Sequence, residues 1–235
     1  MENKIKKNIS EIQDQINFFA KKYQRDSKEI NLIAVSKYHT TESIKAAYEC
    51  GIENFGENYI QEWQKKHTAL NNLPNIKWHL IGHIQSNKAK YINSNIHCIH
   101  SIDKLNLAKE IEKKSNIDSN LKIKALVQLQ IDKNDKNKSG ISFENAKELC
   151  SYIVQSKKMK FAGFMGIGPE ETNKDYLRKS YEVFAKNSES LWQSCADNSK
   201  EKYILSLGMS SDYEIAIEHG STLLRIGTAI FGKKK

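Results

Sequence analysis

Short apolar runs alternate with amphipathic helical segments along this chain, and that alternation restricts its fold more than any other feature. Runs that are apolar or β-branched in their middles predict eight strands, at residues 32–37, 54–58, 77–82, 98–103, 125–131, 161–168, 203–209 and 222–228. Helical segments are predicted between them, at residues 41–50, 59–70, 86–91, 104–114, 142–154, 174–197 and 211–220. Strands that are buried on both faces and joined by helices form a parallel sheet.

Eight such units predict an α/β fold, a closed (β/α)8 TIM barrel that spans residues 1–235 as a single domain. A doubly wound open sheet is the alternative, but no Gly-x-Gly-x-x-Gly motif follows the first predicted strand. A further helix is predicted at residues 1–22, with an apolar face made of Ile5, Ile9, Ile12, Ile16 and Phe19. After the last predicted strand the chain reaches Lys235 too soon for an eighth helix. We therefore expect the N-terminal helix to fill that gap, because the first and last strands are neighbours in a closed barrel.

The composition argues against several classes of protein. Hydrophobic residues make up 39% of the chain and charged residues 28%, which fits neither a disordered nor a membrane-spanning chain. The chain opens without a signal-peptide pattern, and its four cysteines lack metal-ligand spacing, so we expect a cytoplasmic protein with reduced thiols and no membrane partner. The net charge of +9 suits nucleic acid, but the lysines are scattered and no aromatic residues are interleaved with them. Nucleic acid is therefore not an expected partner.

Lys37 closes the first predicted strand, which is an unusual place for a charge. One interpretation is that its aliphatic stem lies along the barrel rim while the ammonium group reaches water. The other is a desolvated amine that forms a Schiff base with a carbonyl compound. The working site of a TIM barrel lies at the carboxyl ends of its strands, so the residues at the other strand ends decide between these interpretations.

The loops after the last two predicted strands carry groups that suit a phosphate, which barrels commonly bind there. Gly227 allows backbone N–H groups to approach an anion, and the hydroxyls of Ser210 and Thr228 add donors. A serine before a helix is also a common N-cap, which is the alternative for Ser210. Arg225 points into the barrel and needs an acceptor there, either a structural carboxylate or a ligand atom such as a pyridine nitrogen. Together these groups indicate pyridoxal 5′-phosphate (PLP) as the cofactor.

Several sequence blocks also resemble those of a known family, and they occur in the same order. They are Ala34-Val35-Ser36-Lys37, Asn54-Phe55-Gly56-Glu57-Asn58-Tyr59, Trp78-His79-Leu80-Ile81-Gly82, Gln85-Ser86-Asn87-Lys88, Lys138-Ser139-Gly140, Leu205-Ser206-Leu207-Gly208-Met209-Ser210 and Arg225-Ile226-Gly227-Thr228-Ala229-Ile230-Phe231-Gly232. Over nearly its whole length the chain resembles the pyridoxal phosphate homeostasis proteins, single-domain barrels related to the amino-terminal domain of alanine racemase.

The resemblance implies roles for five of the six candidate site residues. Lys37 would hold PLP as a Schiff base, and Ser210, Gly227 and Thr228 would hold its phosphate. Arg225 would face the pyridine nitrogen, and Asn58, at the end of the second predicted strand, completes the predicted cofactor-binding set.

Two functions remain open at this stage. The first is a carrier that holds PLP, buffers it and delivers it, with PLP-dependent apo-enzymes as partners. The second is a PLP-dependent amino-acid racemase, which needs a proton-transfer group on each face of the substrate α-carbon. Lys37 could serve one face, but no motif marks His79, His83 or Tyr59 as a base for the other, and His79 suits a hydrogen-bonded core position. An arginine at the pyridine nitrogen also weakens the ring as an electron sink, so we favour the carrier over an enzyme.

Overall fold

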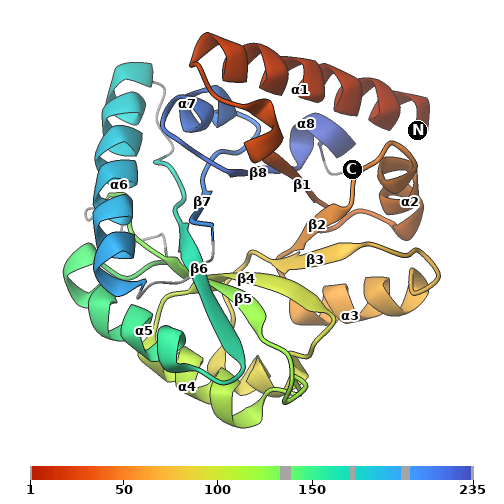
Figure 1. Cartoon of the computed structure of the whole chain (residues 1–235). Coiled ribbons are helices and arrows are strands. Elements are labelled where there is room, and N and C mark those ends of the chain that lie inside the picture. Colours follow the sequence, from red (N-terminus) through yellow and green to blue (C-terminus); the bar gives the residue numbers. More distant parts are fainter. Residues whose placement is uncertain (1, 133–138, 170–172, 197–201, 234–235) are drawn as a thin grey trace.

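The computed structural model describes residues 2–132, 139–169, 173–196 and 202–233, and its central element is a closed, all-parallel barrel of eight strands (Figure 1). The strands are β1 (Asn31–Val35), β2 (Asn54–Glu57), β3 (Lys77–Leu80), β4 (Ile96–Ile102), β5 (Ile123–Gln128), β6 (Met159–Met165), β7 (Ile204–Ser206) and β8 (Leu223–Ile226). They pair in sequence order, and β1 closes the barrel on β8 with Asn31 opposite Leu223 and Ala34 opposite Ile226. The predicted TIM barrel is confirmed.

Helices surround the barrel, as the alternating sequence pattern predicts. The α-helices are α1 (Glu2–Lys22), α2 (Thr41–Glu49), α3 (Ile60–Ala69), α4 (Leu105–Lys114), α5 (Phe143–Gln155), α6 (Lys174–Cys195), α7 (Tyr213–Glu218) and α8 (Thr228–Phe231). Two 3₁₀ helices, η1 (Ser27–Glu29) and η2 (Ser86–Tyr91), complete the set. No helix within the described ranges is both long enough and apolar enough to cross a bilayer. The predicted end of the helix at residue 197 lies outside the described residues.

The N-terminal helix α1 occupies the predicted place. Its isoleucines recur on one face and are buried, at Ile5, Ile9, Ile12 and Ile16. This face packs against α2, α7 and α8, which flank β1 and β8 (Figure 1). Phe19 lies at the edge of the interface and is only partly buried.

Two sequence predictions, one about the last helix and one about the strand ends, need correction. The prediction that no eighth helix forms was wrong, because residues Thr228–Phe231 make the short helix α8, in which Ile230 is buried and which ends at Gly232 with a φ of 88°. The strands are also shorter than predicted at their carboxyl ends. Tyr38, with a φ of 65°, turns the chain away soon after β1 ends, so Lys37 lies in the following loop and not on the strand.

Candidate functional site

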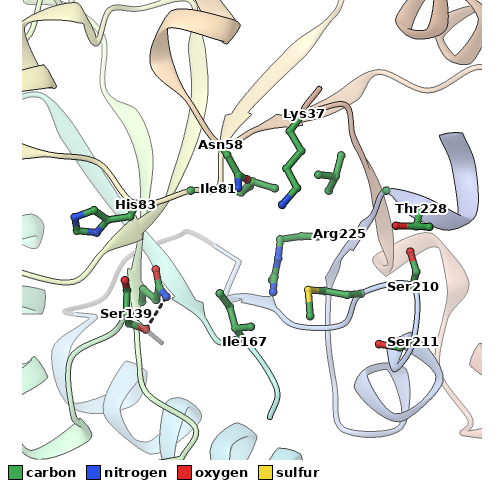
Figure 2. Close-up of a pocket in the computed structure, with 15 residues that line it drawn as sticks. Lys37, Asn58, Ile81, His83, Ser139, Ile167, Ser210, Ser211, Arg225 and Thr228 are labelled. Atoms are coloured by element: carbon green, nitrogen blue, oxygen red, sulfur yellow. Dashed lines mark hydrogen bonds between the residues drawn. The ribbon is translucent and has the colours of Figure 1, made fainter. Parts of the chain in front are cut away.

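The carboxyl ends of the strands surround a pocket of about 610 Å³. All six predicted site residues line it: Lys37, Asn58, Ser210, Arg225, Gly227 and Thr228. Lys37 and Asn58 follow β1 and β2, Ser210 follows β7, and the other three lie on β8 or directly after it. Closure of the barrel therefore brings the two ends of the chain to one site (Figure 2).

Lys37 is half-buried, and its side chain points into the pocket toward Arg225 (Figure 2). This orientation differs from a stem that lies along the barrel rim, and because the side chain is only half-buried it is not fully desolvated either. The side chain instead presents a primary amine to a cavity that is open to solvent. A primary amine in such a place can condense with an aldehyde.

A buried ion-pair network fixes the backbone on both sides of Lys37. Nζ of Lys66 donates to the backbone oxygen of Ser36 at 2.7 Å, to Oε1 of Glu57 at 2.8 Å and to Oε1 of Glu62 at 2.7 Å. The Ser36 hydroxyl donates to Glu57 at 2.6 Å, and the Tyr38 amide donates to Glu62. Burial raises the pKa of the Glu57 carboxyl, and the charge of Lys66 partly offsets this. The network was missed from sequence, where the only signal is the spacing of four residues between Glu62 and Lys66 on α3.

The loops after β7 and β8 form the side of the pocket predicted to hold phosphate. The Ser210 hydroxyl oxygen accepts a hydrogen bond from the Ala229 amide at 3.3 Å, so Ser210 joins the two loops. It is not the N-cap of α7, which is Asp212. A Cβ atom added to Gly227 would lie 3.2 Å from the backbone oxygen of Val35, which is tighter than most real Cβ contacts. Glycine thus lets the β8 loop approach the β1 loop without displacing it.

The Asp212 side chain links the loop after β7 to helix α6. Its carboxylate accepts hydrogen bonds from the Met209 amide at 2.5 Å and from the Tyr181 hydroxyl at 2.8 Å. Burial, with the Asp212 carboxylate as a second cause, raises the pKa of Tyr181, so its hydroxyl keeps its proton and acts as a donor. The backbone around Ser210 is thereby fixed from α6, a third element of the barrel.

Arg225 is buried at the floor of the pocket, with 5% of its surface exposed. Its Nη1 donates to the backbone oxygen and to the hydroxyl of Ser206, both at 2.7 Å, and its Nη2 donates to the backbone oxygen of Gly166 at 2.9 Å. Among the described residues no carboxylate forms an ion pair with it, so the structural carboxylate of the sequence alternative is not its partner. Burial lowers the pKa of Arg225, which nevertheless stays a cation because an arginine pKa starts so high. These bonds do not use its Nε–H group.

Other lining residues were less clear from sequence. Gln128, the last residue of β5, lines the pocket and donates to the backbone oxygen of Ser139 at 2.7 Å. Ile167 and Met209 add an apolar part of the wall. Lys138, which belongs to one of the resemblance blocks, lies outside the described residues.

The three candidate bases for a second proton transfer lie in different places. His83 lines the pocket, and its Nδ1 is 3.9 Å from the carboxylate of Asp103. Tyr59 is exposed and lines a separate, smaller cavity. His79 is buried inside the barrel and hydrogen-bonded, which confirms the core position predicted for it.

Comparisons with known proteins give one consistent result. The family model for the alanine racemase N-terminal domain matches residues 7–235. The pyridoxal phosphate homeostasis protein of Aquifex aeolicus is 34% identical over 97% of this chain and 97% of its own length, and that of Escherichia coli K12 is 33% identical over 99% and 97%. The structure of PipY from Synechococcus elongatus with PLP bound matches with a TM-score of 0.81 at 27% identity, covering 97% of this chain and all of that one. Alanine racemase from E. faecalis shares the fold, with a TM-score of 0.71 at 15% identity over 99% of this chain and 58% of that one.

Proposed function

This chain belongs to the pyridoxal phosphate homeostasis protein family, and from that premise we propose that it binds PLP in the pocket at the carboxyl ends of its strands and passes it on to other proteins. The observation that carries this proposal is the set of lining residues. An amine, two hydroxyls with a glycine, and a guanidinium come from three separate parts of the chain and face one cavity. These groups match the aldehyde, the phosphate and the ring nitrogen of PLP.

The pocket fits the cofactor in size and in donor chemistry. About 610 Å³ is within the range of small-molecule sites. The hydroxyls of Ser210 and Thr228 suit a phosphate, and Gly227 leaves room for the phosphate to approach the backbone. Arg225 is held from below by Ser206 and Gly166, so it can offer a donor to a ring nitrogen without moving.

Lys37 would hold the cofactor covalently. Its neutral amine adds to the aldehyde carbon, a C=N bond forms, and the carbonyl oxygen leaves as water. Water or another amine reverses the step and releases the cofactor. The pocket is open at its mouth, which suits exchange with a recipient better than guarded chemistry. An arginine at the ring nitrogen donates a hydrogen bond but keeps its proton, so the residues favour holding over carbanion chemistry.

Reduction with borohydride tests the site. The full chain is incubated with PLP, reduced, digested and mapped by mass spectrometry. We expect the reduced pyridoxyl group on Lys37 and no label in Lys37→Ala. Lys45→Ala is the control and should keep the label, because Lys45 is the next lysine along the chain and is exposed on α2. A label on another lysine, or no label, would overturn the proposal.

Delivery is tested separately. PLP-loaded protein is either mixed directly with a PLP-dependent apo-enzyme or kept apart from it by a dialysis membrane, so that in the second case only free PLP reaches the enzyme. We expect the apo-enzyme to gain activity faster on direct mixing than through free PLP at the same total concentration. Equal rates would show that the protein only stores the cofactor.

The racemase alternative retains one supporting observation, because His83 lines the pocket near Asp103. A racemase with Lys37 and His83 on opposite faces of a substrate would convert L-alanine to D-alanine. Chiral chromatography after long incubation with L-alanine and PLP distinguishes the two functions. We expect no D-alanine, and D-alanine that disappears in both Lys37→Ala and His83→Asn would favour the racemase.

A further inference from the structure

A line of hydrogen bonds runs from Arg225 through the interior of the barrel to the amino-terminal end of β2. The Ser206 hydroxyl lies 2.7 Å from Nη1 of Arg225 and 3.0 Å from Nδ1 of His100. Nε2 of His100 lies 2.9 Å from Nδ1 of His79, and Nε2 of His79 lies 3.1 Å from Oδ1 of Asn54. These five residues come from five different strands, β8, β7, β4, β3 and β2.

The chemistry of its two ends gives this line a single direction. The amide oxygen of Asn54 only accepts, so His79 carries its hydrogen on Nε2 and donates to Asn54. In a neutral ring Nδ1 of His79 is then an acceptor, so His100 donates to it from Nε2, and Nδ1 of His100 accepts from the Ser206 hydroxyl. At the other end a guanidinium only donates, so the Ser206 oxygen accepts from Arg225. Every donor points away from the pocket, and both histidines are neutral Nε2–H tautomers.

The surroundings of the two histidines keep them neutral. His100 is fully buried and His79 is 2% exposed. Burial lowers the pKa of both imidazoles well below the ordinary value, and the charge of Arg225 adds to this at His100. A proton added to Nδ1 of His79 would set two N–H groups against each other across the 2.9 Å to Nε2 of His100. A proton added to Nδ1 of His100 would meet the hydroxyl hydrogen of Ser206 across 3.0 Å.

A metal centre is the competing explanation for this cluster. Ligand atoms of His79, Cys98 and His100 lie within 4.8 Å of one another. However, the hydrogen bonds already use both ring nitrogens of each histidine. Burial also raises the pKa of the Cys98 thiol to about 12, so the sulfur keeps its proton and is a poor ligand. The observations favour the hydrogen-bonded arrangement.

We propose that Ser206, His100 and His79 are positioning residues, a directional relay that fixes the guanidinium of Arg225 and so determines how it meets the ligand in the pocket. A carboxylate partner would offset the positive charge that Arg225 presents to the ligand. A chain of neutral donors and acceptors anchors the guanidinium and leaves that charge uncompensated. The relay itself is a property of the chain alone. Its effect on PLP rests on the proposed function.

The tautomers test the relay directly in the full chain without cofactor. Two-dimensional ¹⁵N–¹H spectra that correlate the ring nitrogens with the ring protons assign the tautomer of each histidine. We expect His79 and His100 as neutral Nε2–H forms from pH 8 to pH 5, while the partly buried His67 serves as a comparison outside the relay. A Nδ1–H tautomer or a protonated ring at either position would overturn the proposal. Zinc that shifts both histidines at one equivalent would favour the metal centre instead.

Variants then test whether the relay reaches the ligand. In His100→Leu the Ser206 hydroxyl loses its acceptor, and we expect PLP to bind about tenfold more weakly, the effect of losing one hydrogen bond in a charged network. In His100→Asn the amide oxygen takes the place of Nδ1, and affinity should return to within about threefold of the wild type. The resonance of ¹⁵N-labelled PLP at the pyridine nitrogen should move in the leucine variant and return in the asparagine variant.

If the relay had a purely structural role, PLP affinity would fall equally in both variants and the pyridine nitrogen resonance would not move. That result would overturn the proposal. If His100→Leu fails to fold, the tautomers and the asparagine variant still decide. Failure of the proposed function has a different signature. In that case the wild type takes no label at Lys37 after borohydride, whatever the histidine spectra show.

Discussion

Lys66 holds the backbone that carries Lys37, although it lies on a helix and outside the pocket. Its side chain is 7% exposed and pairs with Glu57, whose side chain is fully buried. A buried carboxylate is tolerable only while its counter-charge is present, because the charge is otherwise taken out of water without compensation. The Glu57–Lys66 pair therefore links the stability of the barrel to the geometry of its site.

Replacing Lys66 by methionine should destabilise the protein by about 3–5 kcal/mol, since it leaves the Glu57 charge buried and unpaired. Urea unfolding followed by circular dichroism measures this. Lys77→Met is the matched control, because its pair with Glu53 is about half exposed and should be worth about 0–1 kcal/mol. The double variant Glu57→Gln, Lys66→Met should recover most of the loss. An equal small effect of both lysine substitutions would contradict the assigned role.

The interior histidines make stability depend on pH. Burial lowers the folded-state pKa of His79 and His100 well below the ordinary value, and burial with Lys124 and Lys77 lowers that of His97 to about 4. Above about pH 6.5 neither the folded nor the unfolded state binds these protons. Below it only the unfolded chain takes them up, so stability falls as the pH falls.

The expected slope is up to about 1.4 kcal/mol per pH unit for each such histidine. Unfolding free energies measured between pH 8 and pH 5 should therefore decrease toward the acidic side. In His100→Asn one titrating histidine is removed, so the slope should fall by up to about 1.4 kcal/mol per pH unit. For His97 the loss should continue down to about pH 4, where the folded state also binds the proton. Stability that is flat or rises toward pH 5 would show that these rings are protonated in the folded protein.

At the residue scale, the sequence allowed prediction of the groups at the mouth of the barrel but not those beneath it. Lys37, Ser210 and Thr228 come soon after the carboxyl ends of β1, β7 and β8, so locating each strand from the sequence is enough to place these side chains at the mouth of the barrel. The partners His100 and Ser206 are 106 residues apart, and nothing local to either residue indicates the other. Which inward residues meet depends on the register between strands, and single-sequence patterns do not contain that register.

At the scale of elements, α1 is the helix that supports the site from outside. The Asn8 amide donates to the backbone oxygen of Ile230 at 2.8 Å, and Lys22 pairs with Glu214 on α7 at 3.0 Å. Arg25, just after α1, donates to the backbone oxygens of Ile217 on α7 and of Ser221 between α7 and β8. The helix thus braces the two elements that follow the predicted phosphate loops.

Ile9→Ala should test this support. Ile9 is 1% exposed, so the substitution removes buried methylenes and leaves a cavity, at a cost of about 2–5 kcal/mol. Phe18→Ala on the same helix is the control, because Phe18 is 63% exposed and touches mainly the edge of Phe19. Its cost should not exceed about 1 kcal/mol. Thermal unfolding of both variants beside the wild type gives the comparison, and equal losses would mean that α1 is not packed as described.

The helix boundaries followed from sequence more closely than the strand boundaries did. Helix α2 begins after Thr40, whose side chain accepts from the Ser43 amide, and such capping groups are visible in the sequence. Strand β7 is three residues long, whereas the apolar run around it spans 203–209. The loops that leave the barrel remain apolar because they line the pocket and cover the core, so hydropathy does not mark where the strand ends.

At the scale of the whole molecule, closure of the barrel makes one site out of the two ends of the chain. β1 pairs with β8, and Gly227 approaches Val35 across that contact. A ligand held by Lys37 on one side and by Ser210 and Thr228 on the other would bridge the contact that closes the barrel. Its binding should therefore stabilise the whole fold, and not one loop alone.

Ligand binding is then measurable as resistance to heat, and the two ends of the ligand can be separated. PLP at 100 times its dissociation constant should add about 2.7 kcal/mol, which for a chain of this size corresponds to a rise in Tm of roughly 5–10 °C. Pyridoxal has the same aldehyde but no phosphate, so at the same concentration it should give a smaller rise. A Ser210→Ala, Thr228→Val variant should bring the effect of PLP down to that of pyridoxal, while Lys37→Ala should abolish the effect of pyridoxal and keep part of that of PLP. Equal shifts with PLP and pyridoxal in the wild type would mean that the loops after β7 and β8 do not hold the phosphate, even if Lys37 carries the label after reduction.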